Sequence, residues 1–213
     1  MQSTTLRQPG LRVTEHTLSV PLDHARPEGD RIEVFARAVV AADKVDAAQP
    51  WLLFLQGGPG FEGPRPTSPD SPAWLRRALA DHRVLLLDQR GMGRSSPLGP
   101  ADAAAWPPPA LADRLALYRA DSIVRDAECF RTALGIDRWS VLGQSFGGFC
   151  AHGCNGDTRN SNSSSKIEWQ FNLLTSGARR LTARSIWFLI NRSIVSGVSP
   201  VTTLVTFGPV MNM

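Results

Sequence analysis

The sequence predicts an α/β fold built around a parallel sheet, and three short, mostly apolar runs at residues 51–55, 84–87 and 139–142 carry this prediction. None of the three alternates apolar with charged side chains, which is typical of parallel strands that are buried on both faces. A glycine follows each run closely, and helical patterns lie between the runs. A strand, a loop, a helix and a further strand in this order are characteristic of α/β proteins.

Two further strands are expected before the first apolar run. Residues 14–20 and 32–40 both place apolar side chains at every second position, as half-buried strands do. The segment between them, residues 21–30, contains proline, glycine and aspartate and is expected to form a turn region.

Two helices are expected between the apolar runs. Residues 72–80 begin with proline and carry two leucines four positions apart, which is helical spacing. Residues 121–134 repeat apolar side chains at helical intervals, with Asp121 as the candidate N-cap and Gly135 directly after the end. Residues 98–109 are rich in proline and are expected to form a surface loop.

The composition changes abruptly near residue 153. Every asparagine lies at or beyond Asn155, whereas all but two of the 16 prolines precede it. Residues 1–152 carry equal numbers of basic and acidic side chains, so the net charge of +4 belongs entirely to residues 153–213. We therefore expect residues 1–152 to form one structural unit, and residues 153–213 to be an unrelated or frameshifted tail that is poorly ordered.

Within this tail, residues 155–166 have the composition of a loop or a disordered segment. Residues 185–190 and 201–207 fit either short strands or a helix, and nothing links them to the preceding pattern. A sheet that stops at residues 139–142 leaves its outer strand unpaired, and an unpaired edge is an aggregation hazard.

Composition and charge argue against several classes of protein. The balanced charge of residues 1–152, and the absence of a dense basic cluster from the tail, argue against nucleic-acid binding. The first residues lack the apolar segment of a secretion signal, and three cysteines give neither a disulfide framework nor paired metal ligands. Residues 193–213 are uncharged but contain glycines, prolines and hydroxyl side chains, so a membrane helix is not expected. We expect a cytoplasmic protein without a metal or another cofactor.

The residues with the clearest chemical potential follow the third apolar run, where residues 143–147 read Gly-Gln-Ser-Phe-Gly. In a tight turn from a strand to a helix, Gly143 and Gly147 leave room for the backbone, and Ser145 projects at the carboxyl end of the strand. Ser145 is therefore the candidate nucleophile, and an ordinary glycine-rich turn is the alternative interpretation.

A second glycine-rich motif follows the first apolar run, where residues 57–60 read Gly-Gly-Pro-Gly. Because glycine lets the backbone approach a substrate oxygen closely, an N–H of this loop can join the N–H after the nucleophile in an oxyanion hole. A tight turn that leads into a helix is the alternative.

A third motif follows the second apolar run, where residues 88–95 read Asp-Gln-Arg-Gly-Met-Gly-Arg-Ser. We expect Asp88 and Arg90 to hold the loops beside the site through charge-assisted hydrogen bonds. Their expected role is structural, although they lie near the pocket.

Taken together and in this order, the three motifs make residues 11–151 resemble the proline iminopeptidase family of serine aminopeptidases. The resemblance implies the α/β-hydrolase fold, with only the N-terminal part of its sheet present and the chain truncated after the nucleophile elbow. It also implies an enzyme that releases an N-terminal residue, typically proline, from a peptide substrate through an acyl-enzyme.

The family pattern carries roles over to individual residues. It implies Ser145 as the nucleophile, and Gly58 and Phe146 as backbone N–H donors to the oxyanion. The supporting motif residues are Gly57, Gly60, Asp88, Arg90, Gly143 and Gly147. Gln56 stands where many members have a histidine, a change that leaves the N–H donors untouched.

The remaining members of a catalytic triad are missing from the pattern. An α/β hydrolase needs an aspartate or glutamate after the serine, and then a histidine. After Ser145 the only carboxylates are Asp157 and Glu168, and the only histidine is His152. His152 follows Ser145 by seven residues in the expected helix, which is about 10 Å along the axis, so it is a poor base.

We therefore expect this chain to lack the triad aspartate and histidine and to be inactive by itself. Two alternatives stay open. One is an esterase of the same fold, because the same elbow serves acyl esters. The other is a non-catalytic fragment that binds a partner which supplies the missing strands.

Overall fold

The computed structural model describes residues 1–58, 60–153, 167–172 and 202–209, with side chains up to residue 151. The expectations for residues 155–166 and 185–190 lie outside these ranges. The elements in chain order are β1 (Gln2–Gln8), β2 (Leu11–Pro21), β3 (Arg31–Ala41), a short 3-10 helix (Ala42–Lys44), β4 (Trp51–Leu55), α1 (Ala73–Asp81), β5 (Arg83–Asp88), α2 (Pro100–Ala104), α3 (Pro108–Ala116), α4 (Ala120–Ala133), β6 (Trp139–Gln144), α5 (Phe146–Gly153), β7 (Ile167–Asn172) and β8 (Thr202–Pro209).

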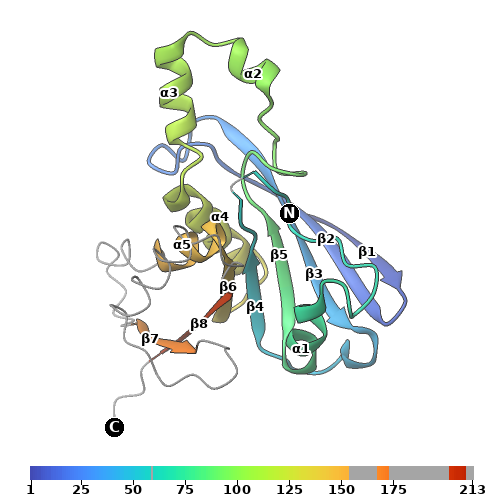
Figure 1. The fold of residues 1–213 in the computed structure, drawn as a ribbon. Helices are drawn as coiled ribbons and strands as arrows, with labels where there is room; N and C mark the ends of the chain where they lie inside the picture. Colours follow the sequence, from blue (N-terminus) through green and yellow to red (C-terminus); the bar gives the residue numbers. More distant parts are fainter. Residues whose placement is uncertain (59, 154–166, 173–201, 210–213) are drawn as a thin grey trace, which may run out of the picture.

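A mixed sheet runs through the described residues in the strand order β1-β2-β3-β5-β4-β6-β8-β7 (Figure 1). β4 pairs in parallel with β5 on one side and with β6 on the other, and the remaining pairings are antiparallel. The register places Leu53 opposite both Leu85 and Val141. The prediction of three parallel strands is confirmed, and their carboxyl ends lie at the same end of the sheet.

The two predicted N-terminal strands are confirmed as β2 and β3, which form a long antiparallel pair. The sequence does not predict β1. This strand pairs with β2 along its whole length, from Gln2 opposite Thr17 to Gln8 opposite Leu11, and nearly all of its residues are exposed. An edge strand that is exposed on both faces needs no apolar periodicity, so the pattern gave no signal for it.

The expectation of an unpaired outer edge on β6 is wrong. β8 pairs antiparallel with β6, from Ser140 opposite Thr206 to Gln144 opposite Thr202, and β7 pairs with β8 in turn. Of the two forms that the sequence allowed for residues 201–207, the strand is the one observed. A β-branched segment such as Thr-Thr-Leu-Val-Thr has the propensity to satisfy the free backbone groups of β6.

Helices cover both faces of the central strands. On one face, α4 and α5 contribute Ile123, Phe130 and Cys150 to a core with the strand residues Leu53 and Leu85. On the other face, α1 packs Leu75 and Leu79 against alternate residues of the same strands, namely Leu52, Phe54, Val84 and Leu86. Because successive strand residues point to opposite faces, both faces of β4 and β5 are buried, as their continuous apolar sequence predicts.

The two predicted helices are confirmed as α1 and α4, but the predicted N-cap of α4 is wrong. α4 begins after Arg119, which makes no side-chain capping bond, and Asp121 lies inside the first turn. A carboxylate at this place still interacts favourably with the positive end of the helix dipole. Gly135 follows the helix with φ +65°, the left-handed conformation that ends many helices.

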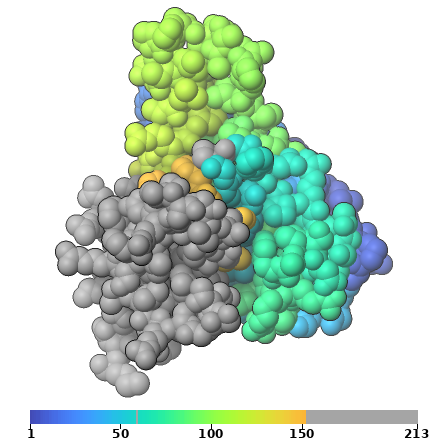
Figure 2. Space-filling view, viewed as in Figure 1, coloured from blue at the N-terminus to red at the C-terminus, as the bar shows by residue number. Residues whose placement is uncertain are grey.

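The expectation of a plain loop at residues 98–109 is also wrong, because α2 and α3 begin there. Each of these helices has proline in its first turn, where the missing N–H group and fixed φ of proline are tolerated. Neither helix has a buried residue. Figures 1 and 2 show the two helices as a protrusion from the body of the molecule.

Among the described residues, no helix combines the length and the apolar character that a bilayer span requires. The same residues contain no group of three or more side chains suited to hold a metal ion.

Candidate active site

The predicted nucleophile lies at the corner between β6 and α5. Ser145 follows the last residue of β6, precedes Phe146 at the start of α5, and is exposed. Its φ is +51°, which is uncommon for a residue with a side chain and indicates a functionally constrained turn. The backbone N–H of Phe149 donates to the Ser145 carbonyl oxygen at 3.2 Å and so closes the first turn of α5.

Two glycines make this corner sterically possible. A Cβ atom at Gly143 would clash with the backbone of Gly147. A Cβ atom at Gly147 would clash with the carbonyl oxygen of Leu55 at the end of β4. The strand-to-helix turn therefore depends on both glycines, as the sequence predicts from the motif.

The Gly-Gly-Pro-Gly loop lies directly against the corner. A Cβ atom at Gly57 would lie 2.6 Å from the Gln144 carbonyl oxygen and 2.8 Å from the Ser145 Cβ, so the contact admits only glycine. Gly58 and Gly60 have φ of +125° and +116°, which favour glycine for a second reason. The loop backbone is thus brought directly beside Ser145.

Side chains of the third motif hold both ends of this loop. Gln89 donates from Nε2 to the Gln56 carbonyl oxygen at 2.9 Å. The Asp88 carboxylate accepts the backbone N–H of Gly63 at 2.9 Å and that of Arg94 at 3.0 Å. The sequence reasoning missed Gln89, although its place between Asp88 and Arg90 in the motif was a usable signal.

Asp88 is fully buried, and its burial raises the pKa of the carboxyl above its usual value. The N–H of Arg94, the charge of Arg37 and the N–H of Gly63 oppose this shift, because each favours the ionised form. The carboxylate therefore acts as a buried acceptor that joins two loops.

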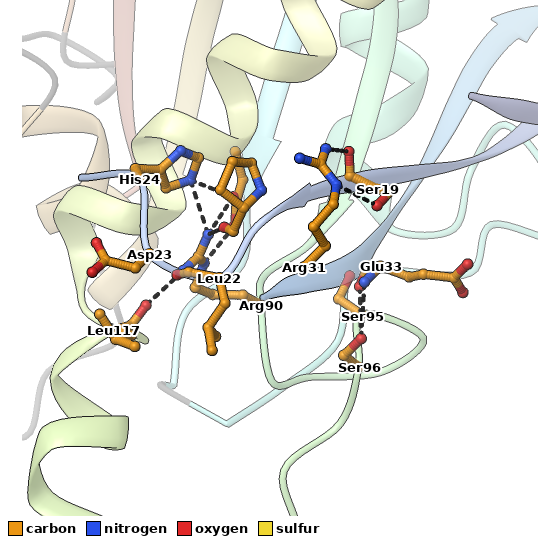
Figure 3. A network of polar contacts seen from close by, with 12 residues as sticks. Ser19, Leu22, Asp23, His24, Arg31, Glu33, Arg90, Ser95, Ser96 and Leu117 are labelled. Carbon is orange, nitrogen blue, oxygen red and sulfur yellow. Dashed lines mark hydrogen bonds and ion pairs between the residues drawn. The ribbon is translucent and has the colours of Figure 1, made fainter. Parts of the chain in front are cut away.

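Arg90 is fully buried within another set of elements (Figure 3). Its Nε and Nη2 donate to the two carboxylate oxygens of Asp126 in α4, at 2.7 and 2.5 Å. Its Nη1 donates to the carbonyl oxygens of Leu22 and Leu117, both at 2.7 Å, and His24 Nε2 lies 2.9 Å from both Nη2 and Asp126. In the described part of the chain, these contacts join the turn after β2, the segment after α3 and helix α4.

Exposed aromatic side chains flank both the elbow and the glycine loop. Phe149, one turn further along α5, is 65% exposed and stacks on Phe146 with ring centroids 6.1 Å apart. Phe61, in the loop after Gly58, is 64% exposed, and a Cβ atom at Gly58 would lie 2.9 Å from its ring. The candidate site thus has apolar surface on both the α5 side and the loop side.

The histidines whose side chains are described lie in other elements. His16 of β2 bonds through Nδ1 to Ser3 Oγ at 2.8 Å, and burial lowers its pKa. His24 belongs to the Arg90 cluster, and His82 precedes β5. The backbone of His152 lies in α5 as expected, and Glu168 lies in β7, whereas Asp157 is outside the described residues.

Comparison with known proteins shows which sequences this chain resembles. Residues 50–152 match the family model for the alpha/beta hydrolase fold. The chain is 50% identical over 144 residues to the proline iminopeptidase of Aeromonas sobria, and the matched segment covers 67% of this chain and 33% of that protein. It is 42% identical over 149 residues to a proline iminopeptidase of Aspergillus aculeatus, which covers 66% of this chain and 33% of that protein.

A solved structure, the proline iminopeptidase of Mycobacterium smegmatis, is 26% identical with a TM-score of 0.37. The match covers 65% of this chain and 38% of that one. This chain thus spans about a third of the length of the Aeromonas and Aspergillus relatives.

Proposed function

Because this chain is a partial α/β hydrolase of the proline iminopeptidase type, we propose that it carries the nucleophile half of a serine aminopeptidase. The enzyme releases an N-terminal residue, typically proline, from peptides. The observation that supports this most is the exposed Ser145 with φ +51° between β6 and α5, against which Gly57 packs. This turn has the geometry that presents a serine hydroxyl to a substrate.

In the proposed reaction, the Ser145 hydroxyl oxygen attacks the carbonyl carbon of the first residue, and its proton passes to a histidine base. The N–H groups of Gly58 and Phe146 stabilise the oxyanion of the tetrahedral intermediate. Removal of a single such donor costs about 100- to 1000-fold in rate in serine hydrolases. The peptide leaves with the proton from the histidine, and water then releases the first residue from Ser145.

The substrate class is supported by the surface around Ser145. Phe61 and Phe149 offer exposed aromatic rings there, and proline is an apolar residue whose ring packs on such surfaces. A peptide with N-terminal proline is therefore the proposed substrate. The mechanism needs no metal and no other cofactor.

We also propose that residues 153–213 are an unrelated or frameshifted tail and that the chain alone is inactive. The change in composition near residue 153 supports the first part. The second part is supported by the position of His152, which lies seven residues after Ser145 in α5 and is a poor base for it. Sequencing the genomic region across codon 152 and translating it in all three forward reading frames tests the origin of the tail.

Intact-mass spectrometry with a fluorophosphonate probe tests whether Ser145 is activated. We expect the folded wild-type chain and its Ser145→Ala variant to stay equally unlabelled. One adduct per chain in the wild type, absent from Ser145→Ala, would mean that a base reaches the serine and that the chain alone is reactive.

A chimera tests the activity itself. Residues 1–152 are joined to the part of the Aeromonas sobria proline iminopeptidase that follows its own nucleophile elbow. We expect this chimera to hydrolyse prolyl-aminomethylcoumarin and to lose that activity on Ser145→Ala. Hydrolysis of short acyl esters without any prolyl amidase activity would favour the esterase alternative.

A further inference from the structure

A small pocket lies on the face of the sheet that carries α1, and it is separate from the elbow. It has a volume of about 120 Å³, and its polar wall consists of Gln8, Glu15, Arg37, Arg65 and Arg94. β1, β2 and β3 form one side, and the segments after β4 and β5 form the other. β3, β5 and β4 separate β2 from β6 in the sheet, so this pocket is not the proposed active site (Figure 1).

Arg37 is the buried centre of this pocket, and its guanidinium group is poorly paired. Its side chain is 4% exposed, yet its Nη1 is 3.4 Å from Asp88 Oδ1 and its Nε is 3.5 Å from Glu15 Oε1. Good N–H···O bonds are about 2.7–3.2 Å long. Burial is also the main reason why the pKa of Arg37 is lowered. A buried guanidinium with such long contacts has hydrogen-bonding capacity left for an anion.

Arginines outnumber carboxylates among the side chains that line the pocket. The lining holds three arginines and one carboxylate, Glu15, which accepts Arg94 Nη1 at 2.7 Å. Two carboxylates outside the lining also face these arginines: Glu62 lies 3.1 Å from Arg65 Nη2, and Asp88 lies 3.4 Å from Arg37 Nη1. Arg37 and Arg94 both lie over the ring of Phe35, with their Cζ atoms 4.5 and 3.9 Å from its centroid. These contacts hold two guanidinium groups in place before any ligand arrives, which lowers the cost of binding.

Gln8 adds a second unmet requirement. Its Oε1 atom is buried and has no hydrogen-bond partner among the residues that the structure describes. A buried acceptor without a donor costs free energy. Gln8 lines the same pocket. A ligand with an N–H group beside its anionic group can therefore donate to Gln8 Oε1 and accept from the arginines.

We propose that this pocket binds a carboxylate with an amide N–H on the adjacent carbon, the chemistry shared by N-acyl amino acids and peptide C-termini. The carboxylate pairs with Arg37 and Arg94, since guanidinium groups match carboxylates in a two-pronged geometry. The N–H donates to Gln8, and the side chain contacts the apolar wall near Leu6. The site is independent of the proposed aminopeptidase activity, because none of these residues belongs to the elbow or the glycine loop.

Isothermal titration of the full chain with N-acetyl-alanine tests this proposal. We expect saturable binding that weakens about tenfold or more in Arg94→Gln, and also for N-acetyl-alaninamide, which lacks the charge. Gln8→Leu is expected to weaken binding several-fold. Arg77→Gln, which changes an exposed arginine of α1 paired with Asp81, is the matched control and is expected to bind like the wild type.

The proposal is overturned if the folded wild type shows no saturable binding, or if Arg94→Gln binds as tightly as the wild type. Inorganic phosphate that binds as tightly as N-acetyl-alanine would overturn the assigned ligand class. A tripeptide ending in alanine separates the two sources of the same chemistry. Tighter binding of the tripeptide supports a peptide terminus, and weaker binding supports a free N-acyl amino acid.

Discussion

Arg90 and Arg37 are both buried arginines in or beside the central sheet, yet their surroundings differ. Arg90 donates to both oxygens of Asp126 and to carbonyl oxygens of Leu22 and Leu117, at distances of 2.5 to 2.7 Å. Among the residues whose side chains are described, Arg37 contacts two carboxylates, at 3.4 and 3.5 Å. Burial alone therefore does not assign a role to an arginine: the first has its donors satisfied by the fold, and the second keeps donors for a ligand.

The backbone around each residue explains this difference. Arg90 lies in a loop, where carbonyl oxygens at the end of β2 and after α3 are free of secondary structure and can accept its bonds. Arg37 lies in the middle of β3, where the neighbouring carbonyl oxygens already belong to the sheet. Only side chains can pair with it there.

The largest effect is expected from breaking the satisfied cluster. Arg90→Met leaves Asp126 as a buried charge without its cation and leaves the carbonyl oxygens of Leu22 and Leu117 without their side-chain donor. We expect a loss of about 3–5 kcal/mol in the free energy of unfolding, measured by urea denaturation. A loss below about 1 kcal/mol would contradict the structural role of this cluster.

Removal of the loosely paired arginine is expected to have a smaller effect. Arg37→Met leaves Asp88 with the N–H groups of Gly63 and Arg94, which still bond its carboxylate. We expect a loss of only about 1 kcal/mol in the same urea experiment, because the contacts that disappear are long. A loss as large as that of Arg90→Met would remove the distinction between the two arginines.

The stability of the chain is expected to depend on pH through Asp88, the buried carboxyl group beside Arg37. Burial raises its pKa in the folded chain above the ordinary value of 3.8. A group with a raised pKa stabilises the fold below its unfolded pKa, and this contribution is lost as the pH rises through the folded value. We therefore expect the unfolding free energy of the wild type, relative to Asp88→Asn, to increase as the pH falls from about 7 to 4.

The control for this measurement is Asp81→Asn. A hydrogen bond from Arg77 lowers the pKa of the exposed Asp81, so its contribution has the opposite sign. Relative to Asp81→Asn, the wild type is expected to lose stability slightly over the same pH range. A difference between wild type and Asp88→Asn that does not change with pH would show that the Asp88 pKa is not raised.

The smallest effect is expected at a surface ion pair. Arg76 bonds to Asp70, and both side chains are largely exposed to water, which screens their attraction. We expect the urea midpoint of Arg76→Gln to equal that of the wild type within experimental error. A clear decrease would mean that surface pairs, and not only buried clusters, stabilise this chain.

The central strands could be predicted from the sequence because a strand that is buried on both faces has a continuous apolar sequence. The apolar runs in β4, β5 and β6 reflect packing that does not depend on which distant residues supply it. The elbow could be predicted for a similar reason, since the crowding at Gly143 and Gly147 arises between residues close in sequence or at a strand end.

The remaining features depend on distant contacts or on permissive positions. Arg37 occupies an ordinary strand position, and only the loops after β4 and β5 turn its surroundings into a pocket. The bond from Gln89 to Gln56 likewise joins two loops. Proline is common both in loops and in the first turn of helices. The proline-rich composition of this segment therefore could not distinguish α2 and α3 from a loop.

Because β5 lies between β3 and β4 in the sheet, it determines the order in which the strands can pair during synthesis of the chain. Within the described sheet, β4 pairs with β5 and β6, and both follow it in the chain. On the ribosome, the apolar segment Trp51–Leu55 therefore emerges without a partner and waits until residues 83–88 have been synthesised. During that interval this apolar strand is exposed to association with other chains, because unpaired strand edges and apolar surface promote aggregation.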